Sequence, residues 1–326
     1  MDYKSCDGLM RHLRKQGIAI AGTKQKRQLL NTGYFHGYKG YRFFKDPANR
    51  LPFKAYAEVY ATIQYDAKLK SLFYGKVMYI ETAVKNIALE SILSKARSKE
   101  LSALYARAVS GYHNTYSNTT STDKKSSQTK KLNLQRKNQE LLARAYEKGD
   151  RKIVHYYNKG QNNSAPIWAL LEIMSLGEFA NLLSCLTLDC REDISKRLGL
   201  NLRSDTNREL VYDYLYTIKD LRNALAHNAV IFDTRFRQKD PSRAMTKTLA
   251  DEMGLSYVNF KTIGDYLILI CYYLKLLKIP KIEIKAFIRE FEKITEDYKR
   301  AVNLAVAKIV VHPDLAERIT TLKKHI

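Results

Sequence analysis

The sequence predicts an all-α fold, and three observations support this prediction. The chain has 326 residues but only 14 glycines and 6 prolines, which is too few for the many tight turns of a β-sandwich or barrel. Hydrophobic residues make up 45% of the chain and recur at intervals of three or four residues in its long segments. Alternating patterns typical of half-buried strands are scarce, so we expect helices throughout.

Residues 1–55 are interpreted as an N-terminal basic and aromatic region. Over residues 9–30 the pattern predicts a short amphipathic helix, a break at Gly17, and a second, basic helix. The second helix carries three basic residues that we expect to form a solvated face: Lys24, Lys26 and Arg27. Residues 33–53 combine glycines, prolines and many aromatic side chains, which indicates an ordered loop.

Residues 56–235 are expected to form the helical core. From Tyr56 to Ile92, apolar side chains recur at helical spacing in two successive runs. Pro166 stands in the first turn of a further apolar helix, where its missing N–H costs nothing. Another buried stripe is predicted over residues 206–226.

A polar segment interrupts this core. Residues 111–131 have almost no aliphatic side chains, and we expect a mobile insertion there. Residues 132–159 then resume as a basic helix or a pair of helices.

Residues 236–326 are expected to form C-terminal helices that pack on the core. Phe260–Leu277 is nearly all apolar, which predicts a central, buried helix. After Pro280, apolar residues at helical spacing mark one long amphipathic helix.

The charge balance indicates a nucleic-acid partner. The chain has 56 Lys and Arg against 33 Asp and Glu, a formal net charge of +23, and phosphate contacts gain free energy by releasing counterions. A membrane surface is the rival explanation, but we find no run of 18 apolar residues, no signal peptide and no lipidation motif. We therefore expect a cytoplasmic protein without membrane contact. Six residues are weak candidates for RNA contact: Lys39, Arg42, Lys124, Lys125, Lys130 and Lys131.

The cysteines favour neither a metal site nor a disulfide framework. None of the four forms a CxxC pair, and no histidine lies near them at zinc-finger spacing. Cys185 and Cys271 lie in apolar helical stretches, where a buried thiol is the usual interpretation. We expect reduced cysteines, no metal and no cofactor.

One pair of residues could perform chemistry. The chain lacks the GxSxG motif of serine hydrolases, the phosphate-binding P-loop and the HExxH motif of zinc proteases. His227, however, follows Arg222 by five residues, near the end of a helix that apolar spacing clearly predicts. Five residues on a straight helix place two side chains about 140° apart, whereas Asn223 and His227 share a face. The pair must therefore lie at a helix end, which Asn228 would terminate, or meet a second copy across a dimer.

Such a pair suits RNA cleavage without a metal. A histidine can remove the proton of a ribose 2′-OH or protonate the leaving oxygen, while an arginine binds the phosphate. DNA should resist, because it lacks the 2′-OH. A histidine that caps a helix for purely structural reasons is the alternative interpretation.

Residues 219–227 resemble the R-x4–6-H signature of HEPN-domain ribonucleases, including the Asn that follows the Arg. Three further segments, in the same order along the chain, resemble the bacterial abortive-infection proteins of the AbiD/AbiF group: residues 29–43, 79–85 and 166–178.

This resemblance implies a HEPN-like helical bundle with additional N- and C-terminal helices, acting in phage defence. It implies that Arg222 and His227 are catalytic, with Asn223 as a polar partner that orients them. HEPN sites usually combine two motifs, and this chain has one, so activity would require a homodimer. One departure is Lys85, on the helix that carries Glu81, where the family tends to have Arg. Lysine cannot make the same bidentate contact, so no binding role is assigned to it.

Two other functions stay open. The chain could be a non-catalytic RNA-binding protein that forms a ribonucleoprotein with a structured noncoding RNA, since the charge of +23 requires no catalysis. It could also act on membranes through the apolar stretch at 260–277, but Lys261, Asp265 and Lys275 leave too short a span.

Overall fold

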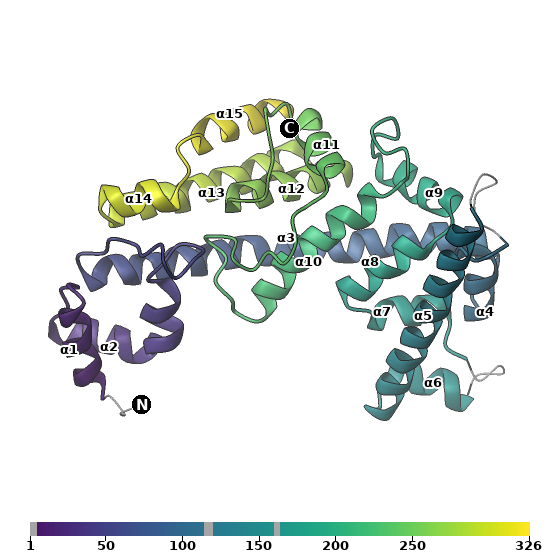
Figure 1. Cartoon of the computed structure of the whole chain (residues 1–326), viewed down its shortest axis with the longest axis horizontal. Coiled ribbons are helices and arrows are strands. Elements are labelled where there is room, and N and C mark those ends of the chain that lie inside the picture. Colours follow the sequence, from purple (N-terminus) through teal and green to yellow (C-terminus); the bar gives the residue numbers. More distant parts are fainter. Residues whose placement is uncertain (1–4, 114–119, 160–163) are drawn as a thin grey trace. The chain divides into compact units, whose positions relative to one another are not determined.

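A computed structural model describes residues 5–113, 120–159 and 164–326 (Figure 1). The predicted all-α fold is confirmed: in the part of the chain that is described, extended backbone pairs only as isolated bridges, such as Ala19 with Ala55. Among these described helices, none combines the length and the apolar character needed to cross a bilayer.

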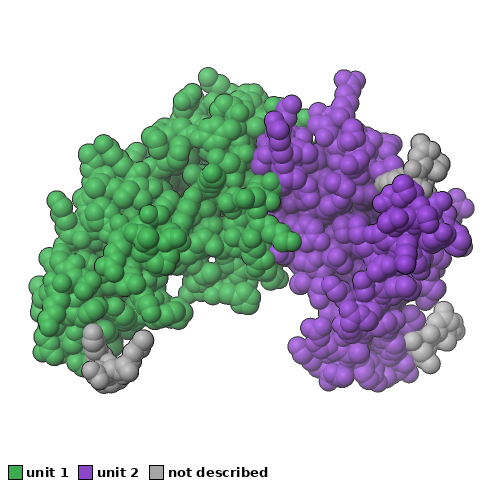
Figure 2. Space-filling model, in the orientation of Figure 1, with its two compact units in different colours: residues 1–77, 220–241, 249–326 green, residues 78–219, 242–248 purple. Residues whose placement is uncertain are grey.

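The chain divides into two compact units, neither of which is continuous in sequence (Figure 2). Unit 1 comprises residues 1–77, 220–241 and 249–326, and unit 2 comprises residues 78–219 and 242–248. The sequence predicts a division of the chain into three regions, at residues 55 and 235. These boundaries stay a prediction, because the two compact units do not show which segments fold on their own.

The helices that lie wholly in unit 1 come from both ends of the chain. They are α1 (Cys6–Lys15), α2 (Gly22–Thr32), the π-helical turn η1 (Tyr34–Lys39), α12 (Ile263–Leu276), α13 (Lys281–Ala301), α14 (Leu304–Val310) and α15 (Leu315–His325). The two N-terminal helices and the break between them agree with the prediction. The Ser5 side chain caps α1, and Gly17 after it adopts a φ of +79°, which glycine tolerates best.

Helix α12 is the buried helix of the C-terminal part of unit 1, and it packs against α13. Every residue from Ile263 to Leu274 is buried, as its continuous apolar sequence predicts. A capping box of Thr262 and Asp265 fixes the start of this helix. Arg318 of α15 donates to the same Asp265 carboxylate at 2.5 Å, so a buried ion pair joins the two helices.

Three helices contribute residues to both units: α3 (Tyr56–Ala96), α10 (Leu210–Ala226) and α11 (Arg243–Glu252). The two apolar runs predicted between Tyr56 and Ile92 form the single helix α3, of 41 residues. No glycine turn or proline separates the runs, and Gly75 within the helix has open space around its Cα.

Unit 2 is built around α5. The elements that lie wholly in unit 2 are α4 (Leu101–Ala103), η2 (Leu104–Ala108), α5 (Ser121–Glu147), α6 (Arg151–Lys159), α7 (Ile167–Ile173), α8 (Leu176–Cys185) and α9 (Leu188–Leu198). Helices α6, α7 and α8 all pack against α5. Pro166 is the N-cap of α7 rather than a residue of its first turn.

The insertion expected at residues 111–131 is corrected for its second half, where α5 begins at Ser121. The Thr120 hydroxyl accepts a hydrogen bond from the Asp123 N–H and caps the helix, although this stretch has no apolar stripe. Buried Leu134, Asn138 and Leu142 anchor the later turns, from which the helix extends back to its cap. Residues 114–119 lie outside the described part of the chain.

Candidate functional site

Two residues of the predicted site, Arg222 and Asn223, lie in the last turns of α10, and the third, His227, follows its last residue, all within unit 1. The buried face of these turns consists of Leu221, Ala224 and Leu225. Arg222 and Asn223 are half-buried beside that face, and His227 is exposed directly after the helix. The motif therefore reaches a helix end, which is one of the two arrangements that the spacing allowed.

A Schellman motif ends α10 and makes His227 its C-cap. The Asn228 N–H donates to the Leu225 carbonyl at 3.4 Å, and the Ala229 N–H donates to the Ala224 carbonyl at 2.8 Å. Asn228 adopts a left-handed φ of +52°, which asparagine tolerates better than most residues. Asn228 therefore terminates the helix, as predicted.

Helical geometry extends as far as His227. Its N–H donates to the Asn223 carbonyl at 3.0 Å, so the spacing from Arg222 to His227 is that of a regular helix. Their side chains consequently leave the helix about 140° apart and do not share a face. Across the described residues, no hydrogen bond or ion pair holds the His227 imidazole, which leaves it accessible.

Lys70 of α3 holds the turn that follows His227. Its ammonium donates to the Asn228 side-chain oxygen at 2.9 Å and forms an ion pair with Asp66, one helical turn earlier, at 2.8 Å. The left-handed residue that ends α10 is thus tied to α3 by a half-buried lysine.

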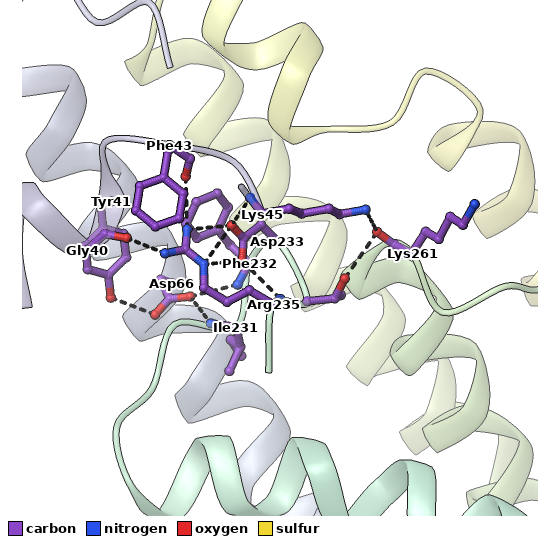
Figure 3. A network of polar contacts seen from close by, with 11 residues as sticks. Gly40, Tyr41, Phe43, Lys45, Asp66, Ile231, Phe232, Asp233, Arg235 and Lys261 are labelled. Atoms are coloured by element: carbon purple, nitrogen blue, oxygen red, sulfur yellow. Dashed lines mark hydrogen bonds and ion pairs between the residues drawn. The ribbon is translucent and has the colours of Figure 1, made fainter. Parts of the chain in front are cut away.

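Asp66 fixes the chain a few residues further on. Its fully buried carboxylate accepts hydrogen bonds from the N–H groups of Ile231 and Phe232, each at 2.8 Å. It also accepts from the Tyr41 hydroxyl at 2.8 Å, as Figure 3 shows. Burial, followed by the Asp66 charge, raises the pKa of Tyr41, which therefore remains a neutral donor.

Arg235 continues this network toward the N-terminal loop (Figure 3). Its guanidinium forms a 2.5 Å ion pair with buried Asp233 and donates to the carbonyls of Gly40 and Phe43. It also lies 4.1 Å from the centroid of the Phe43 ring. The segment after His227 is therefore held by α3 on one side and by residues 40–43 on the other.

The sequence interpretation missed this supporting network. Asp66 lies between Ile63 and Leu69 on the buried stripe of α3, and a carboxylate in an apolar stripe signals a paired, buried charge. Lys70, four residues later, was the visible counter-ion. The partners near residue 231 carried no comparable signal.

The structure agrees that Glu81 and Lys85 share one face of α3. They form a 3.1 Å ion pair in unit 2, and the Lys85 ammonium also donates to the Met174 carbonyl, where α7 ends, at 2.7 Å. Lys85 therefore joins α3 to the end of α7 through these two polar contacts.

The six weak RNA candidates fall in different units. Lys39 and Arg42 belong to unit 1, where the Lys39 ammonium lies 5.2 Å from the Phe35 ring centroid and Arg42 is half-buried. The other four are residues of α5 in unit 2: Lys124, Lys125, Lys130 and Lys131. Lys124 and Lys131 are half-buried, and Lys125 and Lys130 are exposed.

The described residues offer no obvious place for a metal. Within residues 5–113, 120–159 and 164–326, no three His, Cys, Asp or Glu side chains come together as a possible ligand set. All four cysteines are free, and burial raises the pKa of Cys190 to about 12, which makes its thiol a poor ligand.

A comparison with protein families identifies one match. The family model described as Abi-like protein matches residues 27–233, which is more than half of the chain and includes Asp66, Arg222 and His227. No curated protein and no solved structure matches the chain significantly.

Proposed function

Because the chain belongs to the Abi-like protein family, whose role is abortive infection in phage defence, we propose that it is an RNA-binding, metal-independent endoribonuclease of the HEPN type. The observation that carries this proposal is the position of His227. It is an exposed histidine at a helix end, five residues after Arg222, in a turn held in place by the Schellman motif and Lys70.

The proposed roles follow from the chemistry of each side chain. The His227 imidazole takes the proton of a ribose 2′-OH or gives one to the leaving 5′-oxygen. The Arg222 guanidinium binds the phosphate and stabilises the charge that develops on its oxygens. Asn223, on the face of α10 that His227 shares, is a polar partner that orients them.

A second copy of the chain would complete the site. Arg222 and His227 leave α10 about 140° apart, so one phosphate cannot easily contact both side chains of a single helix. In a homodimer with α10 near the two-fold axis, Arg222 of one subunit would face His227 of the other. A symmetric dimer brings the same patch of both subunits together, so a single motif suffices.

The test is cleavage of single-stranded RNA in the presence of EDTA, beside DNA of the same sequence. The protein is purified without nuclease treatment, and the RNA that travels with it is stripped and sequenced. We expect EDTA-resistant cleavage of RNA and none of DNA, since only RNA supplies the 2′-OH. Cleavage of both substrates, or cleavage abolished by EDTA, would contradict the mechanism.

A second candidate function is a non-catalytic ribonucleoprotein with a structured noncoding RNA. The observation in its favour is the net charge of +23, because neutralising phosphates requires no catalysis. One discrete RNA recovered from the purification, without cleavage by the stripped protein, would select this function.

A further inference from the structure

A hollow of about 330 Å³ lies along one face of α2 in unit 1. Four of its lining residues recur at helical spacing on that face: Lys24, Arg27, Gln28 and Asn31. Thr23 and Thr32 of α2, and Tyr60 from the second turn of α3, complete the lining. We call this hollow the α2 pocket.

The charge of the α2 pocket is positive and uncompensated. None of its lining residues is an aspartate or glutamate. Lys24 and Arg27 are exposed, and within the described chain neither forms an ion pair. Two cations one turn apart repel each other, so an anion bound between them would relieve that repulsion.

Lys26, on the same helix, shows the contrast. It pairs with Asp7 of α1 at 2.7 Å and does not line the pocket. The two basic residues that line the pocket are thus the ones without a carboxylate partner in the described chain, and all three side chains keep the exposure expected of a solvated face.

The two helices that form the α2 pocket are joined close to it. The hydroxyls of Thr32, at the end of α2, and Tyr56, at the start of α3, lie 3.3 Å apart. Ahead of α2, the Ala19 carbonyl accepts from the Tyr56 N–H at 2.8 Å, and the Ala19 N–H donates to the Lys54 carbonyl at 2.9 Å. These contacts hold α2 against the start of α3, the helix that carries Tyr60.

The lining suits one nucleotide. Lysine and arginine bind a phosphate, the half-buried Tyr60 ring offers a surface for a base, and the side-chain amides of Gln28 and Asn31 both donate and accept hydrogen bonds. An acidic peptide would use the same cations, but only a nucleotide also brings a planar base that can stack on the ring.

We infer that the α2 pocket binds one nucleotide of single-stranded RNA, with its phosphate between Lys24 and Arg27 and its base against Tyr60. This inference rests on the proposed RNA partner but not on catalysis. It assigns RNA binding to residues distinct from Arg222 and His227.

The role of the cationic side chains in the α2 pocket is tested by measuring the affinity of the protein for a short, labelled single-stranded RNA. All variants carry His227→Ala, so that cleavage does not interfere. Arg27→Ala should weaken binding about 10-fold and reduce the slope of log affinity against log salt by about 0.7, the value for one phosphate contact on a single strand. Lys26→Ala removes the same charge from the next residue and should bind as the parent does.

The ring is tested with Tyr60→Leu and Tyr60→Phe. Loss of a stacked base typically weakens binding by about 5- to 150-fold, so Tyr60→Leu should bind at least 5-fold less tightly, while Tyr60→Phe keeps the ring and the affinity. RNA carrying 4-thiouridine should crosslink to Tyr60, as identified by mass spectrometry. Competition by free nucleoside monophosphates at similar concentration would show instead that the site accepts a free nucleotide.

The outcomes separate this inference from the proposed function. If the parent binds RNA but Arg27→Ala and Tyr60→Leu bind as tightly as Lys26→Ala, the α2 pocket is not an RNA site and the proposed function stands. If the parent binds no RNA at all, both are overturned. Because Tyr60→Phe should fold normally, weak binding by that variant would also contradict a stacking role.

Discussion

The carboxylate of Asp66 is fully buried; it accepts three hydrogen bonds and forms one ion pair. Two bonds come from the backbone at Ile231 and Phe232, the third comes from Tyr41, and the ion pair is with Lys70. Burying a charge costs free energy that only such complete pairing offsets. Since Lys70 also contacts Asn228, this carboxylate indirectly fixes the turn that presents His227.

Replacing Asp66 with Asn should therefore lower the free energy of unfolding by about 2–4 kcal/mol, because the amide nitrogen cannot accept a hydrogen bond and Lys70 loses its counter-ion. Urea unfolding followed by circular dichroism measures this change. Asp251→Asn removes an equal charge at an exposed position of unit 1 and should change the free energy of unfolding by less than about 0.5 kcal/mol. Equal stability of the two variants would show that Asp66 does not hold this region together.

Helix α14 is joined to the start of α3 by a similar but less buried carboxylate. Glu58 accepts hydrogen bonds from the N–H groups of Lys54 and Ala55 and from both nitrogens of Asn303, the N-cap of α14. Burial alone would raise the pKa of Glu58, but these four hydrogen bonds together hold it below its usual value.

A lowered pKa makes this contact dependent on pH. Its stabilisation is present above the pKa of about 4.3 of an unfolded glutamate and is lost as the pH falls through the lower folded value. Glu58→Gln should cost about 1–3 kcal/mol of unfolding free energy at pH 7, and the difference from the parent should shrink below about pH 4. Urea unfolding at several pH values tests this, with the exposed Glu290→Gln as control. A difference independent of pH would contradict the role of the charge.

At the scale of elements, the sequence predicts a helix well where one face is apolar. Helices α3, α10 and α13 follow from apolar spacing, and the end of α10 follows from Asn228. The first turns of α5 have no such stripe; they depend on a cap at Thr120 and on anchors that begin at Leu134. Periodicity alone could not show that this polar stretch is helical.

The candidate site was predictable only in part, for a reason of distance along the chain. Arg222, Asn223 and His227 form a local motif, so one segment of sequence contains them. Asp66 is separated by 165 positions from Ile231, with which it forms a hydrogen bond. A lone sequence gives no sign of such long-range partners, although the buried charge itself was visible.

At the scale of the whole molecule, the family match and the folded units do not coincide. The match ends at residue 233, but unit 1 also includes residues 249–326. Tyr298 of α13 stacks on Tyr65 of α3 at 4.3 Å, and its hydroxyl lies 3.1 Å from that of Thr62. The C-terminal helices therefore complete the unit that contains Asp66, Arg222 and His227.

Cleavage of single-stranded RNA in EDTA by the parent, His227→Ala and His155→Ala is the most direct test of the central claim. His155 is an exposed histidine on α6, so its substitution is a matched control. Loss of a general acid or base should slow cleavage by about 10²- to 10⁴-fold in His227→Ala, with parental rates in His155→Ala. Equal rates for the parent and His227→Ala would contradict the assignment of His227 as a catalytic residue.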